Sequence, residues 1–373
     1  MSEAPLLVFI GTKAQYIKTA PILRELDARG LPYQLIYTGQ HSETFEALEA
    51  AFGVRKADIK LVANFEASTH ASFARWVIAF WCAAFARIRS GEWRGSSAGI
   101  VHGDTASTLF STMALRLSGV RVAHVEAGLR SPRLLEPFPE EIVRRLVSRM
   151  SWFHFAPDAT AVANLAGARG VVINTGGNTL RDALRLALAR LPKGAHAGAG
   201  GYGVVSIHRS ENLSRSRDFD LLMEEVMHAA SISSLKFVLH PATREHLRRT
   251  HWWARLKTVK DLNLTERMDY PDFIRLLVGA SFLMTDGGSN QEEAAMMGLP
   301  TLLLRRATER SDGLEDNVTM SSLDREKIRN FVAAYAGSTW VLRFKGGASP
   351  SVQIVDALGG AAASRLSNER ANG

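Results

Sequence analysis

Cysteine is almost absent from this chain, whose one thiol belongs to Cys82. A framework of intramolecular disulfides is therefore excluded, and the composition favours a reducing compartment such as the cytoplasm. The first residues, MSEAPLLVFIG, also lack basic side chains ahead of their short apolar run. A secretory leader normally begins with such a basic segment, so we expect no signal peptide.

Long hydrophobic runs and concentrated basic stretches are scarce as well. The longest apolar block, Trp76–Ala86, has about half the length that a bilayer span requires. We expect a buried or interface helix there, with peripheral membrane contact as the alternative and no stable membrane insertion. The net charge of +8 comes from scattered lysines and arginines. Nucleic-acid binding usually shows a basic stripe, so we expect no nucleic-acid partner, and a phosphate-bearing small molecule suits this surface equally well.

What the sequence does contain is a repeated alternation of short apolar runs with helical periodicity. Leu6–Gly11 is a continuous apolar run, typical of a strand buried on both faces, and residues 17–30 then show a helical pattern that stops at Gly30. The second half shows the same alternation, with strands expected at Val204–His208 and Leu235–His240 around a helix. Strands that alternate with helices predict parallel α/β sheets.

The length of 373 residues exceeds what one hydrophobic core usually serves. The Ala-, Gly- and Pro-rich stretch 188–203 reads as a linker or surface loop at a domain join. We therefore expect two doubly wound, Rossmann-like domains that face a cleft. The first spans residues 1–172 and is joined by the C-terminal helix 350–373, and the second spans residues 173–349.

Two motif-like patterns carry little weight. Gly198, Gly200 and Gly203 spell G-x-G-x-x-G, but this run precedes a predicted strand instead of following one, so we do not interpret it as a dinucleotide site. His240, His246 and His251 are spaced six and five residues apart, which puts no tight set of metal ligands on one helix face. We expect no metal and no cofactor.

In the stretch MTDGGSNQEEAAMMG, residues 284–298, an acid is followed by two glycines, Ser-Asn and two glutamates, which is not the pattern of an ordinary loop. A predicted strand ends at Asp286, and glycines then permit a tight turn into a helix. The exposed N–H groups of such a helix start form a natural phosphate site. Alternatively, Ser289 and Glu292 have the spacing of a capping box, which requires no ligand. A carboxylate one turn into the helix, Glu293, could accept hydrogen bonds from ribose hydroxyls.

Charged side chains also follow several other predicted strands, where ligands of parallel sheets bind. Each has a structural alternative, since a strand-end Asp104 can cap a helix, a lone histidine is commonly structural, and Lys18 can simply be solvated. The coincidence at several independent strand ends is what predicts a site. The residues are Lys13, Lys18, Asp104, Glu126, Glu140, Glu141, His208, Arg209, Glu309 and Arg310.

Nine ordered motifs in this sequence resemble those of the UDP-N-acetylglucosamine 2-epimerases of bacteria and archaea, and the resemblance extends from Gly11 to about Asn317. The motifs are G-T-x-x-x-x-I-K-x-A-P (Gly11–Pro21), T-G-Q-H (Thr38–His41), H-G-D-T (His102–Thr105), H-V-E-A-G-L-R (His124–Arg130), P-E-E (Pro139–Glu141), T-G-x-N-T (Thr175–Thr179), H-R-x-E-N (His208–Asn212), Q-E-E (Gln291–Glu293) and T-E-R (Thr308–Arg310). Two departures are Lys13 in place of an arginine and Gln15 in place of a glutamate.

The resemblance implies the two-domain GT-B-type architecture, a UDP-sugar substrate and a homodimer, with the Trp76–Ala86 helix as our candidate for part of the interface. It implies proton transfer by Asp104, Glu126 and Glu140, with His208 and Lys18 as further catalytic residues. The residues implied in substrate binding are Lys13, Gln40, His41, Arg130, Arg209, Gly287, Gly288, Ser289, Glu293 and Arg310.

The expected reaction interconverts UDP-N-acetylglucosamine and its manno epimer, for surface polysaccharide or related biosynthesis. In the family the C2 proton is removed, UDP leaves C1 to give a glycal, and UDP returns after protonation of the other face of C2. One alternative is a hydrolysing relative that releases UDP, or an epimerase of a modified nucleotide sugar. Another is a GT-B glycosyltransferase or a non-catalytic nucleotide-sugar binder, which would not need three acids around one sugar carbon.

Overall fold

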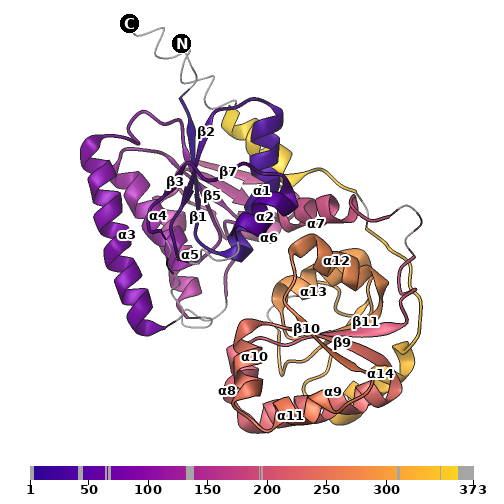
Figure 1. Cartoon of the computed structure of the whole chain (residues 1–373). Helices are drawn as coiled ribbons and strands as arrows, with labels where there is room; N and C mark the ends of the chain where they lie inside the picture. The colour runs from indigo at the N-terminus through magenta and orange to yellow at the C-terminus, as the bar shows by residue number, and fades with distance from the viewer. Residues whose placement is uncertain are drawn as a thin grey trace, which may run out of the picture. The chain divides into compact units, whose positions relative to one another are not determined.

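The fold is known from a computed structural model, which describes residues 4–40, 45–63, 65, 69–131, 138–192, 194, 196–308, 311–344 and 346–359. Its internal contacts divide the chain into two compact units (Figure 1). Unit 1 is Met1–Leu186 together with Gly347–Gly373, and unit 2 is Ala187–Gly346.

Unit 1 contains a seven-stranded parallel sheet with the strand order β3-β2-β1-β4-β5-β6-β7. The strands are β1 (Leu6–Ile10), β2 (Tyr33–Tyr37), β3 (Ile59–Lys60), β4 (Gly99–His102), β5 (Val122–Val125), β6 (Phe153–Ala156) and β7 (Val171–Asn174). The helices are α1 (Lys13–Ala28), α2 (Phe45–Phe52), α3 (His70–Ser90), α4 (Ala106–Leu117), α5 (Glu140–Met150), α6 (Ala159–Ala163) and α7 (Leu180–Leu188).

Unit 2 repeats this plan with a six-stranded parallel sheet in the order β10-β9-β8-β11-β12-β13. The strands are β8 (Tyr202–Ser206), β9 (Ser234–Leu239), β10 (Leu262–Glu266), β11 (Ala280–Thr285), β12 (Thr301–Leu303) and β13 (Val318–Met320). The helices are α8 (Ser210–Ser214), α9 (Ser216–Ile232), α10 (Pro241–Arg248), α11 (Trp252–Lys257), α12 (Tyr270–Gly279), α13 (Gly288–Met297) and α14 (Arg325–Tyr335).

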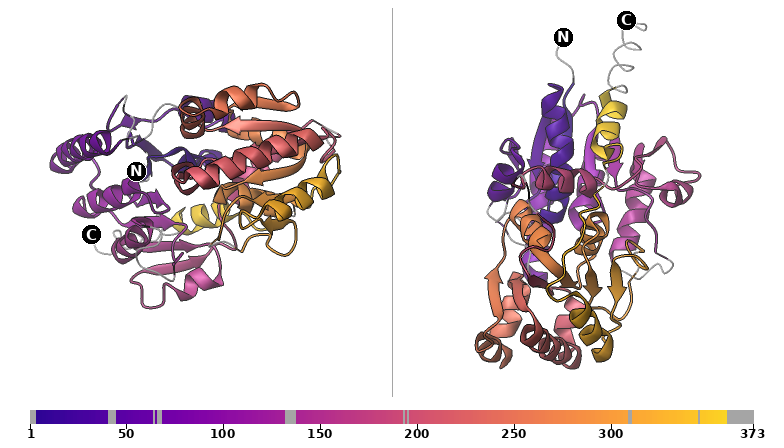
Figure 2. Two further views of the ribbon diagram at one scale, coloured as in Figure 1. Left: turned by 90° about the horizontal axis from the view of Figure 1, so that it is seen from below. Right: turned by 90° about the vertical axis from the view of Figure 1, so that its right-hand side faces the viewer.

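The central strands are apolar throughout because helices cover both faces of each sheet (Figure 2). Every residue of β1 and of β11 is buried. Helix starts are fixed locally, as at Thr12, whose hydroxyl accepts from the backbone N–H of Gln15 while the Gln15 side chain accepts from the Thr12 backbone. The predicted fold class, two doubly wound parallel α/β domains, is confirmed.

Both sheets have one place where the direction of strand order reverses. It lies between β1 and β4 in unit 1 and between β8 and β11 in unit 2. In open parallel sheets ligands bind beyond the carboxyl ends of the strands at this switch point. The segments that leave these strands begin at Gly11, Gly103, Ile207 and Asp286, so four of the predicted motifs lie at the two switch points.

The division between the units differs from the expected boundary after residue 172. That position lies within β7, which pairs with β6 through Phe153 and Val171, so the strand belongs to the sheet of unit 1. The chain returns to unit 1 after Gly346, and residues 350–359 are helical. There the carboxylate of Asp182 in α7 accepts from the Ser349 hydroxyl at 2.8 Å and from the Ser351 backbone N–H at 2.9 Å. The predicted helix residues 360–373 lie outside the described residues.

Helix α3 contains the apolar block singled out in the sequence. Trp76, Phe80 and Ala84 are buried in the core of unit 1, whereas Ile78 and Phe85 are 66% and 49% exposed. By length and composition alone, Ala71–Ser90 is also long and apolar enough to cross a membrane. The burial of its inner face is the behaviour of a helix that packs against a sheet, and its outer face is an exposed apolar surface.

Candidate active site

Gln15 joins the loops that follow β1 and β4 at the first switch point. Its amide nitrogen donates to the His102 carbonyl oxygen at 2.7 Å and to the Thr108 hydroxyl at 2.8 Å. Its amide oxygen accepts from the backbone N–H groups of Gly11 and Thr12. Gln15 is buried, so these bonds hold the H-G-D-T loop, and therefore the backbone of Asp104, against the start of α1.

Glu126 lies at the centre of a buried polar cluster just beyond β5. The Lys18 ammonium contacts its two carboxylate oxygens at 2.8 and 3.0 Å, and both side chains are 10% exposed. The Asn178 amide also donates to this carboxylate, and His102 Nδ1 lies 3.7 Å from it. Glu126 has a φ of +64°, an uncommon conformation for a residue with a side chain. Such strain at a charged residue is a frequent property of functional sites.

Two buried histidines behind this cluster remain neutral. Burial lowers the pKa of His102 to about 3, with the positive charge of Lys18 acting in the same direction and Glu126 opposing it. Burial likewise lowers the pKa of His124 to about 4, although a hydrogen bond to the Gly103 carbonyl oxygen opposes this shift. Both rings therefore serve as uncharged hydrogen-bonding groups at neutral pH.

Asp104 belongs to an ion-pair chain that leads into α5. Its Oδ2 accepts from Arg144 Nε at 2.7 Å and lies 2.6 Å from Arg144 Nη2. Arg144 Nη1 is 3.7 Å from the fully buried carboxylate of Glu141, which also accepts from Arg145 Nε at 2.8 Å. Asp104 does not cap α4, whose N-cap is Thr105. Arg144 therefore orients the Asp104 carboxylate, and the helix-cap alternative for Asp104 is wrong.

The remaining predicted residues of unit 1 have varied surroundings. Glu140 is the first residue of α5, and its Oε2 is buried with no hydrogen-bond partner among the described residues. Gln40 Oε1 is likewise buried and unpartnered within the described ranges. Lys13 is the first residue of α1, directly after the β1 turn. His41 and, in unit 2, Arg310 lie outside the described residues.

Asp286 organises the switch point of unit 2. This fully buried carboxylate accepts from the backbone N–H groups of His208 and Arg209 and from Asn212 Nδ2, at 2.9 to 3.1 Å. His208 Nδ1 lies 3.3 Å from Asp286, and the His208 side chain is 36% exposed. Burial lowers the pKa of His208, while Asp286 opposes that shift. The imidazole is thus held at a fixed position with one side open to solvent.

Helix α13 starts directly beside His208. A methyl group added at Gly287 would lie 2.8 Å from His208 Cε1, so a larger residue here would displace the imidazole ring. The N-cap is Gly287, with no side-chain cap, and Gly288 is the first helical residue. The capping box that we considered for Ser289 and Glu292 is therefore wrong, because the helix begins one residue before the serine. The start of α13 retains its N–H groups without a side-chain cap.

Glu293, the expected ribose contact, is buried one turn into α13. The pKa of Tyr270 is raised well above its usual value by burial and by the adjacent Glu293 carboxylate, with Glu292 adding to the effect. Arg209 lines a separate small cavity of about 170 Å³, together with Arg305 and Arg306. Basic side chains therefore lie close to the His208 loop.

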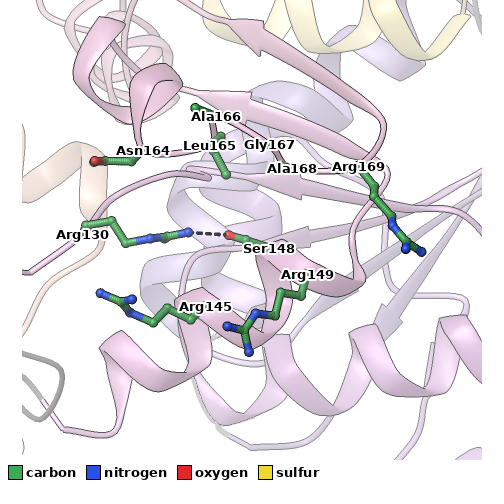
Figure 3. Close-up of a pocket in the computed structure, with 10 residues that line it drawn as sticks. All are labelled: Arg130, Arg145, Ser148, Arg149, Asn164, Leu165, Ala166, Gly167, Ala168 and Arg169. Carbon is green, nitrogen blue, oxygen red and sulfur yellow. Dashed lines mark hydrogen bonds between the residues drawn. The ribbon is translucent and has the colours of Figure 1, made fainter.

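Arg130, one of the expected substrate-binding residues, lines a pocket of unit 1. Its guanidinium donates to the Leu129 carbonyl oxygen and to the Ser148 hydroxyl, and it lines a pocket with Arg145, Arg149 and Arg169 (Figure 3).

The sequence analysis missed two hydrogen-bond partners of the proposed acids, one of Glu126 and one of Asp104. Asn178 lies within the T-G-x-N-T motif, and Arg144 lies one helical turn beyond Glu140, so the motif and the helical spacing were the available signals.

Known proteins resemble this chain over most of its length. A model of the UDP-N-acetylglucosamine 2-epimerase family matches residues 24–346. The UDP-N-acetylglucosamine 2-epimerase of Methanocaldococcus jannaschii is 28% identical over 324 residues, which are 83% of this chain and 86% of that protein. The Bacillus subtilis enzyme of the same name is 29% identical over 341 residues, 88% of this chain and 86% of its own.

Solved structures agree with these sequence matches. The M. jannaschii UDP-GlcNAc 2-epimerase in complex with UDP-GlcNAc and UDP is similar with a TM-score of 0.77 at 25% identity, covering 95% of this chain and 99% of that one. The Neisseria meningitidis enzyme bound to UDP-GlcNAc has a TM-score of 0.76 at 25% identity, with the same coverage. This chain belongs to the UDP-N-acetylglucosamine 2-epimerase family, and it is an isomerase of the class that acts on sugar nucleotides.

Proposed function

We propose that the protein is a non-hydrolysing UDP-sugar 2-epimerase that interconverts UDP-N-acetylglucosamine and UDP-N-acetylmannosamine. The observation that carries this proposal is the buried Lys18–Glu126 pair at the carboxyl end of β5. A C–H next to no carbonyl is a poor acid, so its removal needs a positioned base. Lys18 stabilises the carboxylate form of Glu126, which is the form that accepts a proton.

In the proposed elimination, a carboxylate removes the proton from C2. The C–H electron pair forms the C1–C2 double bond, and the C1–O bond breaks with its electrons going to UDP. Two proton transfers are needed, removal of the C2 proton and delivery of a proton to the other face of C2. We assign them to the carboxyl groups of Asp104, Glu126 and Glu140. Support comes from Arg144, which orients Asp104, and from the buried, unpartnered Oε2 of Glu140 within the described part of the chain.

In the return step a carboxylic acid delivers a proton to the other face of C2, and UDP re-forms its bond to C1. The departing diphosphate needs stabilisation of its negative charge throughout. We propose that the start of α13 at Gly287–Ser289 and the His208 side chain supply it, with Glu293 holding the ribose. The uncapped helix start and the position fixed by Asp286 support these roles.

The test is proton NMR of the purified protein with UDP-N-acetylglucosamine in deuterium oxide. We expect a new UDP-linked manno anomeric signal with deuterium at C2. Glu126→Gln and Asp104→Asn should abolish it, whereas Glu46→Gln, at an exposed acid of α2, should not. Free UDP with a reducing sugar would instead establish the hydrolysing reaction. UDP binding without any turnover would contradict UDP-N-acetylglucosamine as the substrate, and modified nucleotide sugars would then be tested as substrates.

We also propose that the protein is a homodimer whose interface includes the outer face of α3 and the adjacent face of α4. Ile78, Phe85, Met113 and Leu117 are 66%, 49%, 37% and 58% exposed, and the Trp81 and Phe110 rings, 5.9 Å apart, join the two helices. Exposed apolar surface of this kind marks an interaction site. The double variant Ile78→Glu/Phe85→Glu should sediment as a monomer, and an unchanged dimer mass would disprove this interface.

We place the reaction in the cytoplasm, where it would supply manno-configured amino sugar for a surface polysaccharide or a related product. The lone cysteine and the nucleotide-sugar substrate support that location. Cells that lack the protein should lose N-acetylmannosamine-derived sugar from their surface polysaccharides. An unchanged sugar composition would assign the reaction to a different product.

A further inference from the structure

A cavity of about 560 Å³ lies between the end of α5 and the connection from α6 to β7. Among the described residues, the lining combines four arginines with Leu165 and with small and amide side chains, and none of these residues is acidic. The lining residues are Arg130, Arg145, Ser148, Arg149, Asn164, Leu165, Ala166, Gly167, Ala168 and Arg169. Figure 3 shows Arg145 and Arg149 extending from α5 on one side, the 164–169 connection on the other, and Arg130 between them.

This arginine pocket is separate from the proposed catalytic residues. Its walls are the last turns of α5 and the α6–β7 connection, which lead into β6 and β7. The proposed acids instead follow the carboxyl ends of β4 and β5 or begin α5. Asp104, Glu126 and Glu140 do not line the pocket, so a ligand here would not be the reacting sugar.

The pocket has a rigid, partly buried interior. Arg130 Nη1 donates to the Leu129 carbonyl oxygen at 2.8 Å, and Nη2 donates to the buried Ser148 hydroxyl at 3.1 Å. Asn164 Nδ2 donates to the Gly128 carbonyl oxygen at 3.0 Å. These bonds fix one guanidinium and one amide before any ligand arrives, which reduces the entropy that binding must cost.

Positive charge in the pocket is incompletely neutralised. Burial lowers the pKa of Arg130, and Arg145 and Arg144 act in the same direction, although the nearby Glu141 carboxylate opposes them. Within the described ranges, neither Arg149 nor Arg169 pairs with a carboxylate. Guanidinium groups bind the oxygens of phosphate with charge-assisted, often bidentate hydrogen bonds. The cavity also exceeds what one phosphate ion fills, and it falls within the range of small-molecule sites.

One lining residue connects the pocket to the proposed site. Arg145 Nε donates to Glu141 Oε1 at 2.8 Å, and Glu141 Oε2 lies 3.7 Å from Arg144. Arg144 in turn holds Asp104 at 2.6 and 2.7 Å. An anion that attracts Arg145 would weaken the ion pair between Arg145 and Glu141. The buried Glu141 carboxylate would then attract Arg144 more strongly, and the ion pair between Arg144 and Asp104 would weaken.

We propose that the arginine pocket binds a phosphate monoester of a small molecule, and that binding is coupled to Asp104 through Arg145, Glu141 and Arg144. The coupling rests on the proposed function, whereas the binding does not. The shared chemistry is a phosphate dianion attached to a compact organic body. A sugar phosphate and a nucleoside monophosphate both present it, and the experiment separates them.

The binding arm uses calorimetry on protein saturated with UDP, so that the nucleotide site is already filled. N-acetylglucosamine 1-phosphate, AMP and inorganic phosphate are titrated separately. We expect saturable binding of one of the two esters, more weakly for inorganic phosphate. Arg149→Gln and Arg169→Gln should each weaken it by about tenfold. Arg94→Gln, an exposed arginine elsewhere in unit 1, is the matched control and should bind normally.

The better ester identifies the class of ligand, and binding that neither pocket variant weakens would overturn the site. The coupling arm compares kcat for the 2-epimerase reaction with and without the bound ester. We expect at least a twofold decrease in the wild-type protein and none in Arg149→Gln/Arg169→Gln, whose basal rate should be normal. Binding with an unchanged rate would overturn the coupling. If the protein shows no turnover even without ester, the proposed function is rejected. The calorimetry would still test whether the pocket binds a phosphate ester.

Discussion

The Lys18 ammonium contacts both carboxylate oxygens of Glu126, at 2.8 and 3.0 Å, in a pair that is 10% exposed on each side. The two residues come from α1 and from the turn after β5, so the pair fastens the first helix to the centre of the sheet. It also fixes the strained residue Glu126 in the orientation that the proposed proton transfer needs.

Replacement of Lys18 should therefore damage both stability and activity. Lys18→Met leaves the Glu126 charge buried without its cation, which costs about 3 kcal/mol of unfolding free energy. We expect kcat to fall by about 100-fold or more, because the remaining Asn178 contact does not replace an ammonium. Urea unfolding and initial rates measure the two effects. Lys18→Arg preserves the charge and should lose less of both, and equal losses would refute the electrostatic explanation.

The buried histidines predict the direction of the pH dependence of stability. The pKa of His102 falls to about 3 and that of His124 to about 4 in the folded protein, below the ordinary histidine value. Between about pH 6.5 and these values the unfolded chain binds more protons, so the unfolding free energy decreases as pH falls. Each ring contributes a slope of about 1.4 kcal/mol per pH unit over its window.

Denaturant unfolding between pH 7 and pH 4 measures this slope. His102→Gln should reduce it by roughly one histidine's contribution, since the group that resists protonation is gone. His251→Gln, at an exposed position in unit 2, is the control and should leave the slope as in the wild-type protein. A slope that His102→Gln does not alter would mean that His102 does not contribute to the acid sensitivity.

Gln15 should be a positioning residue whose loss acts on Asp104. Gln15→Leu removes the bonds to His102 and Thr108 and leaves the N–H groups of Gly11 and Thr12 unsatisfied. A buried unsatisfied group costs about 1–3 kcal/mol, so we expect a loss of about 3 kcal/mol or more in unfolding free energy. Gln15→Glu keeps the acceptor for the two N–H groups and should lose less.

Initial rates at pH 7 give the functional part of this prediction. We expect kcat to fall with KM little changed, because Gln15 holds the H-G-D-T loop and is not expected to touch the substrate. A rise in KM alone would indicate that Gln15 contributes directly to binding.

Gly287→Ala should weaken UDP binding while leaving unit 2 folded. The added methyl group meets His208 Cε1 at 2.8 Å, closer than carbon atoms can approach, so the ring must move. We expect the UDP dissociation constant to rise by about tenfold. Gly346→Ala, where nothing lies within 4 Å, is the matched control. Calorimetry measures both, and unchanged UDP affinity in Gly287→Ala would separate His208 from the nucleotide site.

Local sequence patterns identified most of the fold, because apolar runs and glycines act where they occur. The run at Leu6–Gly11 became β1, and Ser281–Asp286 became β11 followed by the α13 start. The assignment of β7 to the first sheet was not accessible. This assignment depends on the pairing of β7 with β6 across a helix and a turn, and the local periodicity of the sequence does not indicate which strand β7 pairs with.

The site shows the same division between local and long-range information. Motifs brought Lys18, Glu126 and His208 to attention, but their partners come from distant segments. Asn178 reaches Glu126 across 52 residues of sequence, and Asp286 reaches the His208 backbone across 78. Hydrogen bonds at such separations follow from strand order in the folded sheet, so a reading of single motifs identifies the acids and misses the groups that orient them.

The contacts of Asp182 with Ser349 and Ser351 have a consequence for biosynthesis. Unit 2 is an insertion between two pieces of unit 1, so the ribosome makes all of Ala187–Gly346 before the segment that completes unit 1 exists. At typical translation rates this delay is on the order of ten seconds or more. During it the nascent chain displays the surface of unit 1 that residues 347–359 later cover, which is an opportunity for chaperones or for premature aggregation.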